Sequence, residues 1–257
     1  MQVKSFPGRM FKWEPQTNAL AGSVLGLVIF FLSVAMIYLR RYVWVSIIIR
    51  DLVMILLLGT GIPLLVINKE QNYQGYGLHF KKWYLYLPLN LLLGFLLLLL
   101  LLKAAPLPAD FVLTTELIWE IVYIMLAGVF ETIAFYSFIR TVIERSLGII
   151  PAILITAVFY SFHHAGFQPE FGKLLLVGIL YATVFRIGNS ALLIFPFFWG
   201  VGACYDVIIQ SQKISAIIYP ELRAVILMVG IGLIVNYLVV KKHKYTSELQ
   251  DEEQNGE

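Results

Sequence analysis

The chain contains a single cysteine, Cys204, among its 257 residues. One thiol excludes an internal disulfide and any cysteine cluster that could hold zinc. Charged residues are also scarce, at 14% of the chain, where soluble domains carry about 25%. The net charge of +3 is not gathered into a basic patch, so we expect no nucleic-acid partner. These absences argue against a soluble domain, a disulfide-stabilised scaffold and a nucleic-acid-binding protein.

Apolar residues fill most of the chain, at 60% of its length. A helix needs about 20 of them to cross a bilayer. We expect eight such helices, at residues 18–39, 43–68, 83–102, 115–139, 148–164, 172–186, 189–209 and 221–240. The predicted fold class is therefore all-α, a polytopic transmembrane helical bundle that covers residues 18–240. The first apolar run begins too late and is too long for a cleavable signal peptide.

The two ends of the chain differ from the bundle between them. Residues 1–17 form a polar N-terminal segment, and residues 241–257 form a charged segment that we expect to be a disordered tail. With eight spans, both ends lie on one side of the membrane. Lys and Arg in the loops and at the ends of the spans number twelve on that side and six on the other, so the positive-inside rule places both termini in the cytoplasm. The short loops fit a prokaryotic plasma membrane, with membrane lipid as a partner.

Glu131 and His163 lie deep in two successive apolar segments, with a predicted turn at Leu147-Gly148 halfway between them. If both segments are helices folded back at that turn, a rise of roughly 1.5 Å per residue places each about 23–25 Å from it. Ionisable residues inside membrane helices commonly mark functional sites. The matched depth therefore predicts one polar site. The alternative is a structural hydrogen bond between the two helices.

Two short stretches around these residues carry a resemblance. Residues 128–137 read Gly-Val-Phe-Glu-Thr-Ile-Ala-Phe-Tyr-Ser, and residues 159–163 read Phe-Tyr-Ser-Phe-His. They resemble the first two motifs of the CPBP family, Glu-Glu-x-x-x-Arg and Phe-x-x-x-His. The family comprises intramembrane proteases, among them the type II CAAX prenyl endopeptidases and bacteriocin-processing and immunity proteins. The resemblance covers roughly residues 115–210 and implies a CPBP-like core there.

The chain departs from the family's pattern at several positions. The first motif's second Glu is Thr132 here, and its Arg is Tyr136. The family's third motif, His-x-x-x-Asn, falls on Trp199 and about Ala203. The resemblance implies two catalytic residues, Glu131 and His163. It also implies supporting or cavity-lining residues, which are Thr132, Phe135, Tyr136, Phe159 and Trp199.

The resemblance implies that Glu131 and His163 activate a water for attack on a peptide carbonyl. The indole N–H of Trp199 offers one donor to a developing oxyanion, whereas Ala203 offers none. One hypothesis is thus an intramembrane endopeptidase, a hydrolase that cleaves membrane-embedded or lipid-modified peptides. The other is a pseudoenzyme of the same fold. It would bind a membrane peptide in the cavity that serves as the active site in the proteases, or serve as a structural subunit beside a partner membrane protein.

No cofactor is expected from the sequence. A catalytic zinc takes three protein ligands, and Trp199 cannot ligate where the third motif has its His. Zinc would then require His164 or Asp206 as the third ligand. On a continuous helix His164 points about 100° away from His163, which favours a place at the membrane interface over a place in the site.

Overall fold

The computed structural model describes residues 10–39, 41–109, 111–164, 170–210 and 217–255. Every regular element within these residues is a helix, which confirms the predicted fold class. The elements, in chain order, are α2 (Thr17–Leu39), α3 (Val43–Ser46), η1 (Ile47–Gly61), α4 (Ile62–Glu70), α5 (Trp83–Ala104), α6 (Thr115–Glu131), η2 (Thr132–Ile139), α7 (Arg140–Leu147), α8 (Ile149–His163), α9 (Phe171–Gly188), η3 (Ala191–Leu193), α10 (Phe197–Gln210) and α11 (Pro220–Asn255).

Six continuous helical stretches in the described residues are long and apolar enough to cross a membrane. They are Thr17–Leu39, Val43–Glu70, Trp83–Ala104, Thr115–Leu147, Phe171–Gly188 and Pro220–Lys241. The chain is therefore an integral membrane protein. The remaining two predicted spans are shorter helices, α8 with 15 residues and α10 with 14. At about 1.5 Å per residue, each covers only about 21–23 Å of a hydrocarbon core about 30 Å thick.

The seventh predicted span begins eight residues later than expected, at Phe197 instead of residue 189. The intervening chain forms the short turn η3 and a cis peptide bond between Phe195 and Pro196. Proline lacks an N–H to donate and disfavours the helical conformation in the residue before it. The helix consequently starts after Pro196.

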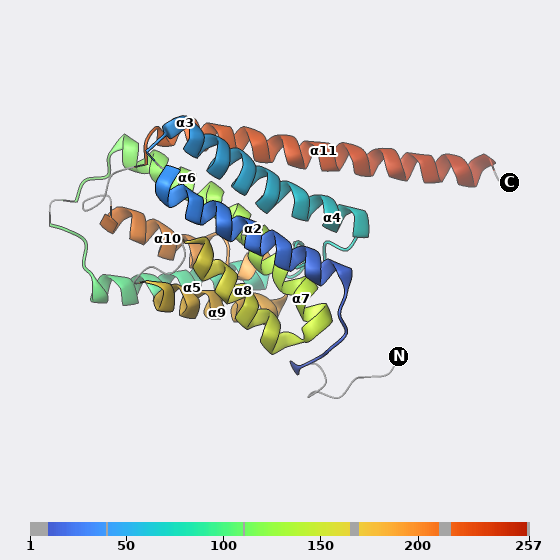
Figure 1. Ribbon diagram of the computed structural model, residues 1–257, viewed down its shortest axis with the longest axis horizontal. Helices are drawn as coiled ribbons and strands as arrows, with labels where there is room; N and C mark the ends of the chain where they lie inside the picture. Colours follow the sequence, from blue (N-terminus) through green and yellow to red (C-terminus); the bar gives the residue numbers. More distant parts are fainter. Residues whose placement is uncertain (1–9, 40, 110, 165–169, 211–216, 256–257) are drawn as a thin grey trace.

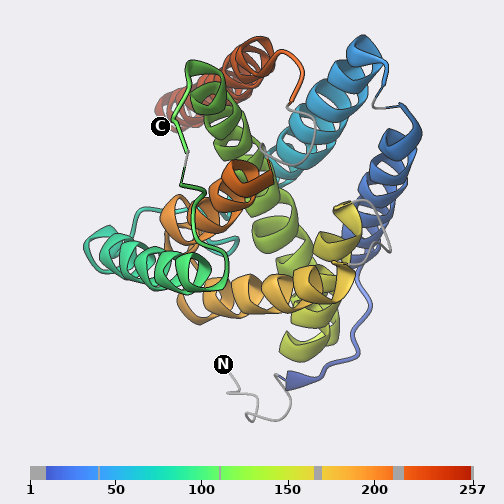
Figure 2. The same ribbon diagram turned by 90° about the vertical axis from the view of Figure 1, so that its left-hand side faces the viewer.

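Seen from the side, the helices run roughly parallel or antiparallel to one long axis (Figure 1). Seen end-on, α6 crosses the middle of the molecule, with α5 and α10 to one side of it and α2 and α3 to the other (Figure 2). This central place makes the stretch from Thr115 to Leu147 the most buried of the six, at 56% of its most apolar window. Glu120 and Glu131, which are buried in that stretch, are held among protein side chains.

Two stretches of backbone are wound more widely than an α-helix. Over η1 and η2 the hydrogen bonds join residues five apart, as when Arg140 N–H donates to the Phe135 carbonyl. Such π-helical turns are rare and occur frequently at functional sites. Gly59, in η1, leaves room for a neighbour, because the Phe130 ring lies 1.8 Å from where a Cβ on Gly59 would stand. The η1 stretch therefore packs against the helix that carries Glu131 only because residue 59 is glycine.

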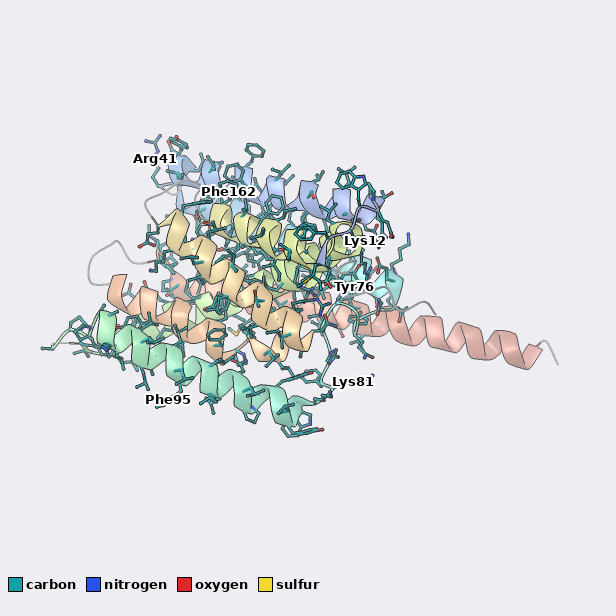
Figure 3. All side chains as sticks on the ribbon, turned by 90° about the horizontal axis from the view of Figure 1, so that it is seen from below. Lys12, Arg41, Tyr76, Lys81, Phe95 and Phe162 are labelled. Atoms are coloured by element: carbon teal, nitrogen blue, oxygen red, sulfur yellow. The ribbon has the colours of Figure 1, made fainter. Side chains whose placement is uncertain are left out.

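The two described ends of the chain lie at the same end of the bundle (Figure 1). Figure 3 shows Lys12, Tyr76 and Lys81 toward that end and Arg41 toward the opposite one. The segment expected as a disordered tail instead continues α11 to Asn255. Residues 233–255 contain neither glycine nor proline. Since the membrane-spanning half has already nucleated the helix, each further residue adds one hydrogen bond without a new nucleation cost.

Tyr76 anchors the connection between α4 and α5 at this end. It is fully buried, and its hydroxyl donates to Glu70 Oε2 at 2.9 Å. Arg145 Nη1 lies 2.8 Å from the same carboxylate oxygen. Burial raises the pKa of the Tyr76 phenol to about 12, and the negative charge of Glu70 adds to that shift.

A buried ion pair fastens α11 to the rest of the bundle. Asp51, on η1, is fully buried and accepts from Arg223 Nε at 2.7 Å and Nη2 at 2.9 Å. The Tyr123 hydroxyl donates to the same carboxylate at 2.7 Å. Asp51 thus pairs with a residue of another membrane-spanning stretch. Charged groups inside a bundle require such partners, because an isolated ion there is costly.

Candidate active site

Glu131 is the central residue of the helical stretch from Thr115 to Leu147. Its side chain is buried, and both carboxylate oxygens have partners. Oε1 lies 3.2 Å from His163 Nε2, and Oε2 accepts from the Trp199 indole N–H at 2.9 Å. The carboxylate therefore stands between α8 on one side and α10 on the other. Its position marks the end of α6, where the backbone widens into η2.

His163 reaches Glu131 because α8 folds back along the preceding helix. The turn between them is at Gly148, whose φ of +92° favours glycine. A Cβ at Gly148 would also meet the Met10 carbonyl oxygen at 2.7 Å. The predicted adjacency of Glu131 and His163 is confirmed, since two helices joined by so short a turn must run antiparallel as neighbours.

Aromatic rings and a hydroxyl fix the orientation of the His163 imidazole. The Phe130 ring meets it edge-on with centroids 5.2 Å apart, and the Phe135 ring lies 5.4 Å away. The Ser33 hydroxyl, from α2, lies 3.5 Å from His163 Nδ1. These contacts leave Nε2 directed at Glu131.

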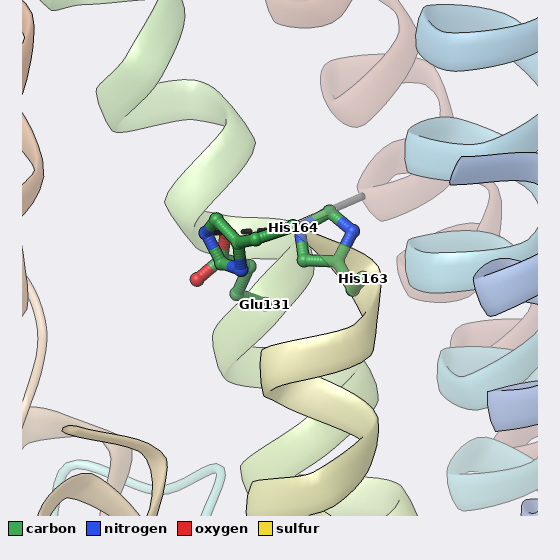
Figure 4. A group of neighbouring side chains, drawn as sticks. All are labelled: Glu131, His163 and His164. Carbon is green, nitrogen blue, oxygen red and sulfur yellow. Dashed lines mark hydrogen bonds and ion pairs between the residues drawn. The ribbon is translucent and has the colours of Figure 1, made fainter. Parts of the chain in front are cut away.

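His164 also belongs to the site, which corrects the expectation that it points away. Its Nε2 lies 3.8 Å from Glu131 Oε1, and its ring centroid lies 4.6 Å from that of His163 (Figure 4). The expectation assumed a continuous helix, but α8 ends at His163 and His164 has a ψ of +38°. Past the helix end the 100° spacing between successive side chains no longer applies. Both imidazoles consequently turn to the same carboxylate.

Trp199 lies on α10, close to the start of that helix. Its ring occupies the space beside Gly128, where a Cβ would stand 2.2 Å from Trp199 Cζ3. Gly128 therefore permits the indole to reach Glu131, one turn of helix further along. The Trp199 indole thus provides a single N–H donor, which is already bonded to the Glu131 carboxylate.

A cavity of about 660 Å³ opens beside Glu131, His163 and His164. Polar or charged side chains on its wall include Ser33, Ser46, Arg50, Tyr160, Glu170 and Lys173, while most of the remaining wall is aliphatic or aromatic. Such a volume lies within the range of pockets that hold small ligands or a short peptide segment. The site is therefore reachable by a molecule from outside the bundle.

The predicted supporting residues divide into two groups. Trp199 lines the cavity and bonds Glu131, and Phe135 packs on His163. The other three, in the described part of the chain, are not on the cavity wall. Thr132 Oγ1 and the Tyr136 hydroxyl are buried without a hydrogen-bond partner among the described residues. Phe159 faces α2, where its ring lies 2.7 Å from a Cβ placed on Gly26. Sequence similarity alone did not distinguish the residues that contact the site from those that only pack in the core.

Three residues of the site were missed or misplaced from the sequence: His164, Ser33 and Arg50. The pair of adjacent histidines was a visible signal, set aside because a regular helix was assumed. Arg50 lines the cavity, and its guanidinium carbon lies 5.7 Å from the centre of the Tyr123 ring. Ser33 carried no signal, because an isolated serine in an apolar helix is common.

The arrangement offers a carboxylate oxygen and two imidazole nitrogens facing one another at the edge of a cavity. One ligand atom from each of Glu131, His163 and His164 lies within 4.8 Å of the others. The group can accept a proton from a bound water, and it contains the ligand types that zinc uses. No protein-family model, curated protein or solved structure matches the chain.

Proposed function

We propose that the protein is an intramembrane endopeptidase that cleaves membrane-embedded or lipid-modified peptides. One observation carries the proposal: Glu131 and His163 meet at 3.2 Å beside a cavity, at the middle of a membrane-spanning helix. Ionisable side chains in such a place are costly and commonly serve a function. The resemblance of the two motifs to the CPBP family supports the same reaction.

In the proposed reaction a water held in the cavity beside Glu131 and His163 attacks the carbonyl carbon of a peptide bond. Glu131 accepts a proton from the water while the oxygen of the water forms the new bond to the carbonyl carbon. That proton is then delivered to the peptide nitrogen as the carbon–nitrogen bond breaks. The products are a carboxylic acid and an amine, so one water is consumed for each bond cleaved. His163 holds the water in line with the carboxylate.

The cavity suits an apolar peptide segment or a lipid chain. Its wall is largely aliphatic and aromatic, with Arg50 as a cation, and so can accept apolar side chains or a lipid chain. The expected partners are therefore membrane lipid and a membrane-embedded or lipidated peptide. We place the protein in a prokaryotic plasma membrane with both termini in the cytoplasm. The two described chain ends lie at one end of the bundle (Figure 1), and Lys12 and Lys81 lie toward the same end (Figure 3), which supports this orientation.

A second candidate, a pseudoprotease of the same fold, is favoured by one feature of the site. The Trp199 N–H is engaged by Glu131 Oε2 at 2.9 Å, so it is not free to stabilise an oxyanion. Ala203, also on the cavity wall, has no polar group to do so. Loss of one oxyanion donor typically slows acyl transfer about 100- to 1000-fold. Such a protein would use the cavity to bind a membrane peptide or a partner membrane protein.

The deciding experiment maps new peptide termini in membranes from cells that express the wild type, Glu131→Gln or Glu116→Gln. The first substitution keeps the shape of the side chain and removes the base. Glu116 lies on the same helix but is exposed, which makes Glu116→Gln the matched control. An endopeptidase produces termini in the wild type and the control that disappear in Glu131→Gln. Identical sets of termini at equal protein abundance would support the pseudoprotease.

A further inference from the structure

We propose that Glu131, His163 and His164 form a binding site for one divalent transition-metal ion of the zinc class. The inference rests on the proposed function for the ion's role, whereas the binding itself is argued from geometry alone. The ligands are Glu131 Oε1, His163 Nε2 and His164 Nε2. The described chain brings no other group of three such ligand residues this close together.

The hydrogen bond of His164 to the backbone determines which of its nitrogens can bind a metal. Nδ1 lies 2.9 Å from the Tyr160 carbonyl oxygen. A carbonyl oxygen only accepts, so Nδ1 carries the hydrogen of the neutral ring. Nε2 then has the lone pair, and it is the atom that faces Glu131 Oε1. Metal-binding histidines in proteins commonly use this arrangement, in which one ring N–H donates to a carbonyl and the other nitrogen ligates.

The environment of His163 leads to the same tautomer. The Ser33 hydroxyl donates its hydrogen to the Ile29 carbonyl at 2.8 Å. Its oxygen therefore accepts at the longer contact of 3.5 Å to His163 Nδ1. With the hydrogen on Nδ1, His163 Nε2 has a lone pair directed at Glu131 Oε1, 3.2 Å away. Two imidazole lone pairs thus converge on a carboxylate oxygen, which is itself an acceptor.

Such a convergence of acceptors needs positive charge between them. The spacing fits a metal ion. Ligand atoms about 2.0–2.2 Å from a tetrahedral zinc stand about 3.3–3.5 Å from one another. The two distances to Glu131 Oε1 are 3.2 and 3.8 Å. All three ligand atoms lie within 4.8 Å of one another, so side-chain shifts of about an ångström or less bring them to ligand spacing.

The chemistry of the three ligands selects the class of ion. Calcium and magnesium prefer six or more oxygen ligands, and this group provides one carboxylate. Two imidazoles and one carboxylate form the set found in several catalytic zinc sites, which keep a fourth position open. Glu131 Oε2 is held by Trp199, so Glu131 binds through one oxygen. The fourth position then faces the cavity, where it is accessible to water.

A bound ion would supply positive charge that makes water a better nucleophile at neutral pH. Glu131 would then act in the reaction as a ligand of the ion as well as a negative charge. His164, which plays no part in the family's motifs quoted above, gains a direct role. The ion also gives a role to each of the two imidazoles that lie beside the buried carboxylate of Glu131.

The test uses Co²⁺ as an optical substitute for Zn²⁺ on the full chain purified in detergent without chelator. We expect one equivalent of Co²⁺ to give visible d–d absorption and to be displaced by Zn²⁺. His164→Gln should weaken binding by more than the roughly 10- to 100-fold that loss of a supporting partner costs. His79→Gln is the matched control, because His79 contacts the Asn189 backbone carbonyl away from the cavity. It should bind as the wild type does.

Absence of a Co²⁺ spectrum in the wild type, with no Zn²⁺ retained on elemental analysis, would overturn the proposal and leave a shared proton between the three groups. Wild-type affinity in His164→Gln would overturn it equally. Should His164→Gln not fold, X-ray absorption of the wild-type zinc protein decides, with two imidazoles and one carboxylate as the expected ligands. These readouts do not involve cleavage. Metal binding and proteolysis can therefore fail independently.

Discussion

Removing one partner of the buried Asp51–Arg223 pair should destabilise the bundle strongly. Both side chains are almost fully shielded, at 0% and 6% exposure, and the nearest oxygen and nitrogen atoms are 2.7 Å apart. Asp51→Asn leaves the Arg223 charge without a counter-ion, which typically costs about 3–5 kcal/mol. For a protein of this size each kcal/mol lowers Tm by about 2–4 °C, so a loss of about 6–20 °C is expected. Arg223→Met should have an effect of the same size.

The paired variant Asp51→Leu with Arg223→Met distinguishes a true ion pair from two unrelated packing losses. Replacing a whole buried pair with apolar residues of similar volume is often neutral or stabilising. Only the Tyr123 hydroxyl then loses its acceptor, at a cost of about 1–3 kcal/mol. The double variant should thus melt about 2–12 °C below the wild type and above either single variant. Thermal unfolding in detergent, followed by size-exclusion chromatography, measures all four proteins. A double variant that melts below both singles would refute the reasoning.

Two further predictions concern packing and alkaline pH. Gly59→Ala places a methyl group against the Phe130 ring and should cost about 1–3 kcal/mol of stability in the same melting assay. Gly232→Ala, with no atom within 4 Å of its Cβ, should melt no lower than the wild type, and equal losses in both variants would contradict the packing argument. Because the pKa of Tyr76 is raised to about 12 from an unfolded value of 10.0, its contribution to stability is complete below pH 10.0 and is lost as pH rises to about 12. Tyr76→Phe should flatten the pH dependence of unfolding in that window, and an unchanged slope would show that the phenol does not titrate there.

The adjacency of Glu131 and His163 could be predicted because it depends only on local rules. The rise per residue of a helix is fixed, and so short a turn, at Gly148, forces the two helices to run antiparallel as neighbours. The same kind of rule failed for His164, since the spacing of side chains on a helix stops where the helix stops. It failed again before Phe197, where a proline delayed the start of α10. Sequence patterns thus determined what lies within an element better than what lies at its ends.

Long-range pairing was beyond local rules altogether. Asp51 and Arg223 are 172 residues apart, and the segment between them contains many other cations. The choice of the cation that pairs with Asp51 depends on how α11 packs along η1. The periodicity of apolar residues does not predict this packing. Ser33 is a similar case, because its contact with His163 follows from the place of α2 in the bundle. The assignment of a peptidase reaction stays a prediction, to be decided by the termini experiment.

The lengths of α8 and α10 explain why a polar site exists inside this bundle. A helix of 15 residues that starts near one surface ends within the bilayer, where its last carbonyls need partners. His164 provides one, since its Nδ1–H donates to the Tyr160 carbonyl near the end of α8. That bond satisfies a backbone group and at the same time turns the opposite ring nitrogen toward Glu131. The capping of a short helix and the assembly of the site are therefore the same interaction, and a substitution at His164 will disturb both.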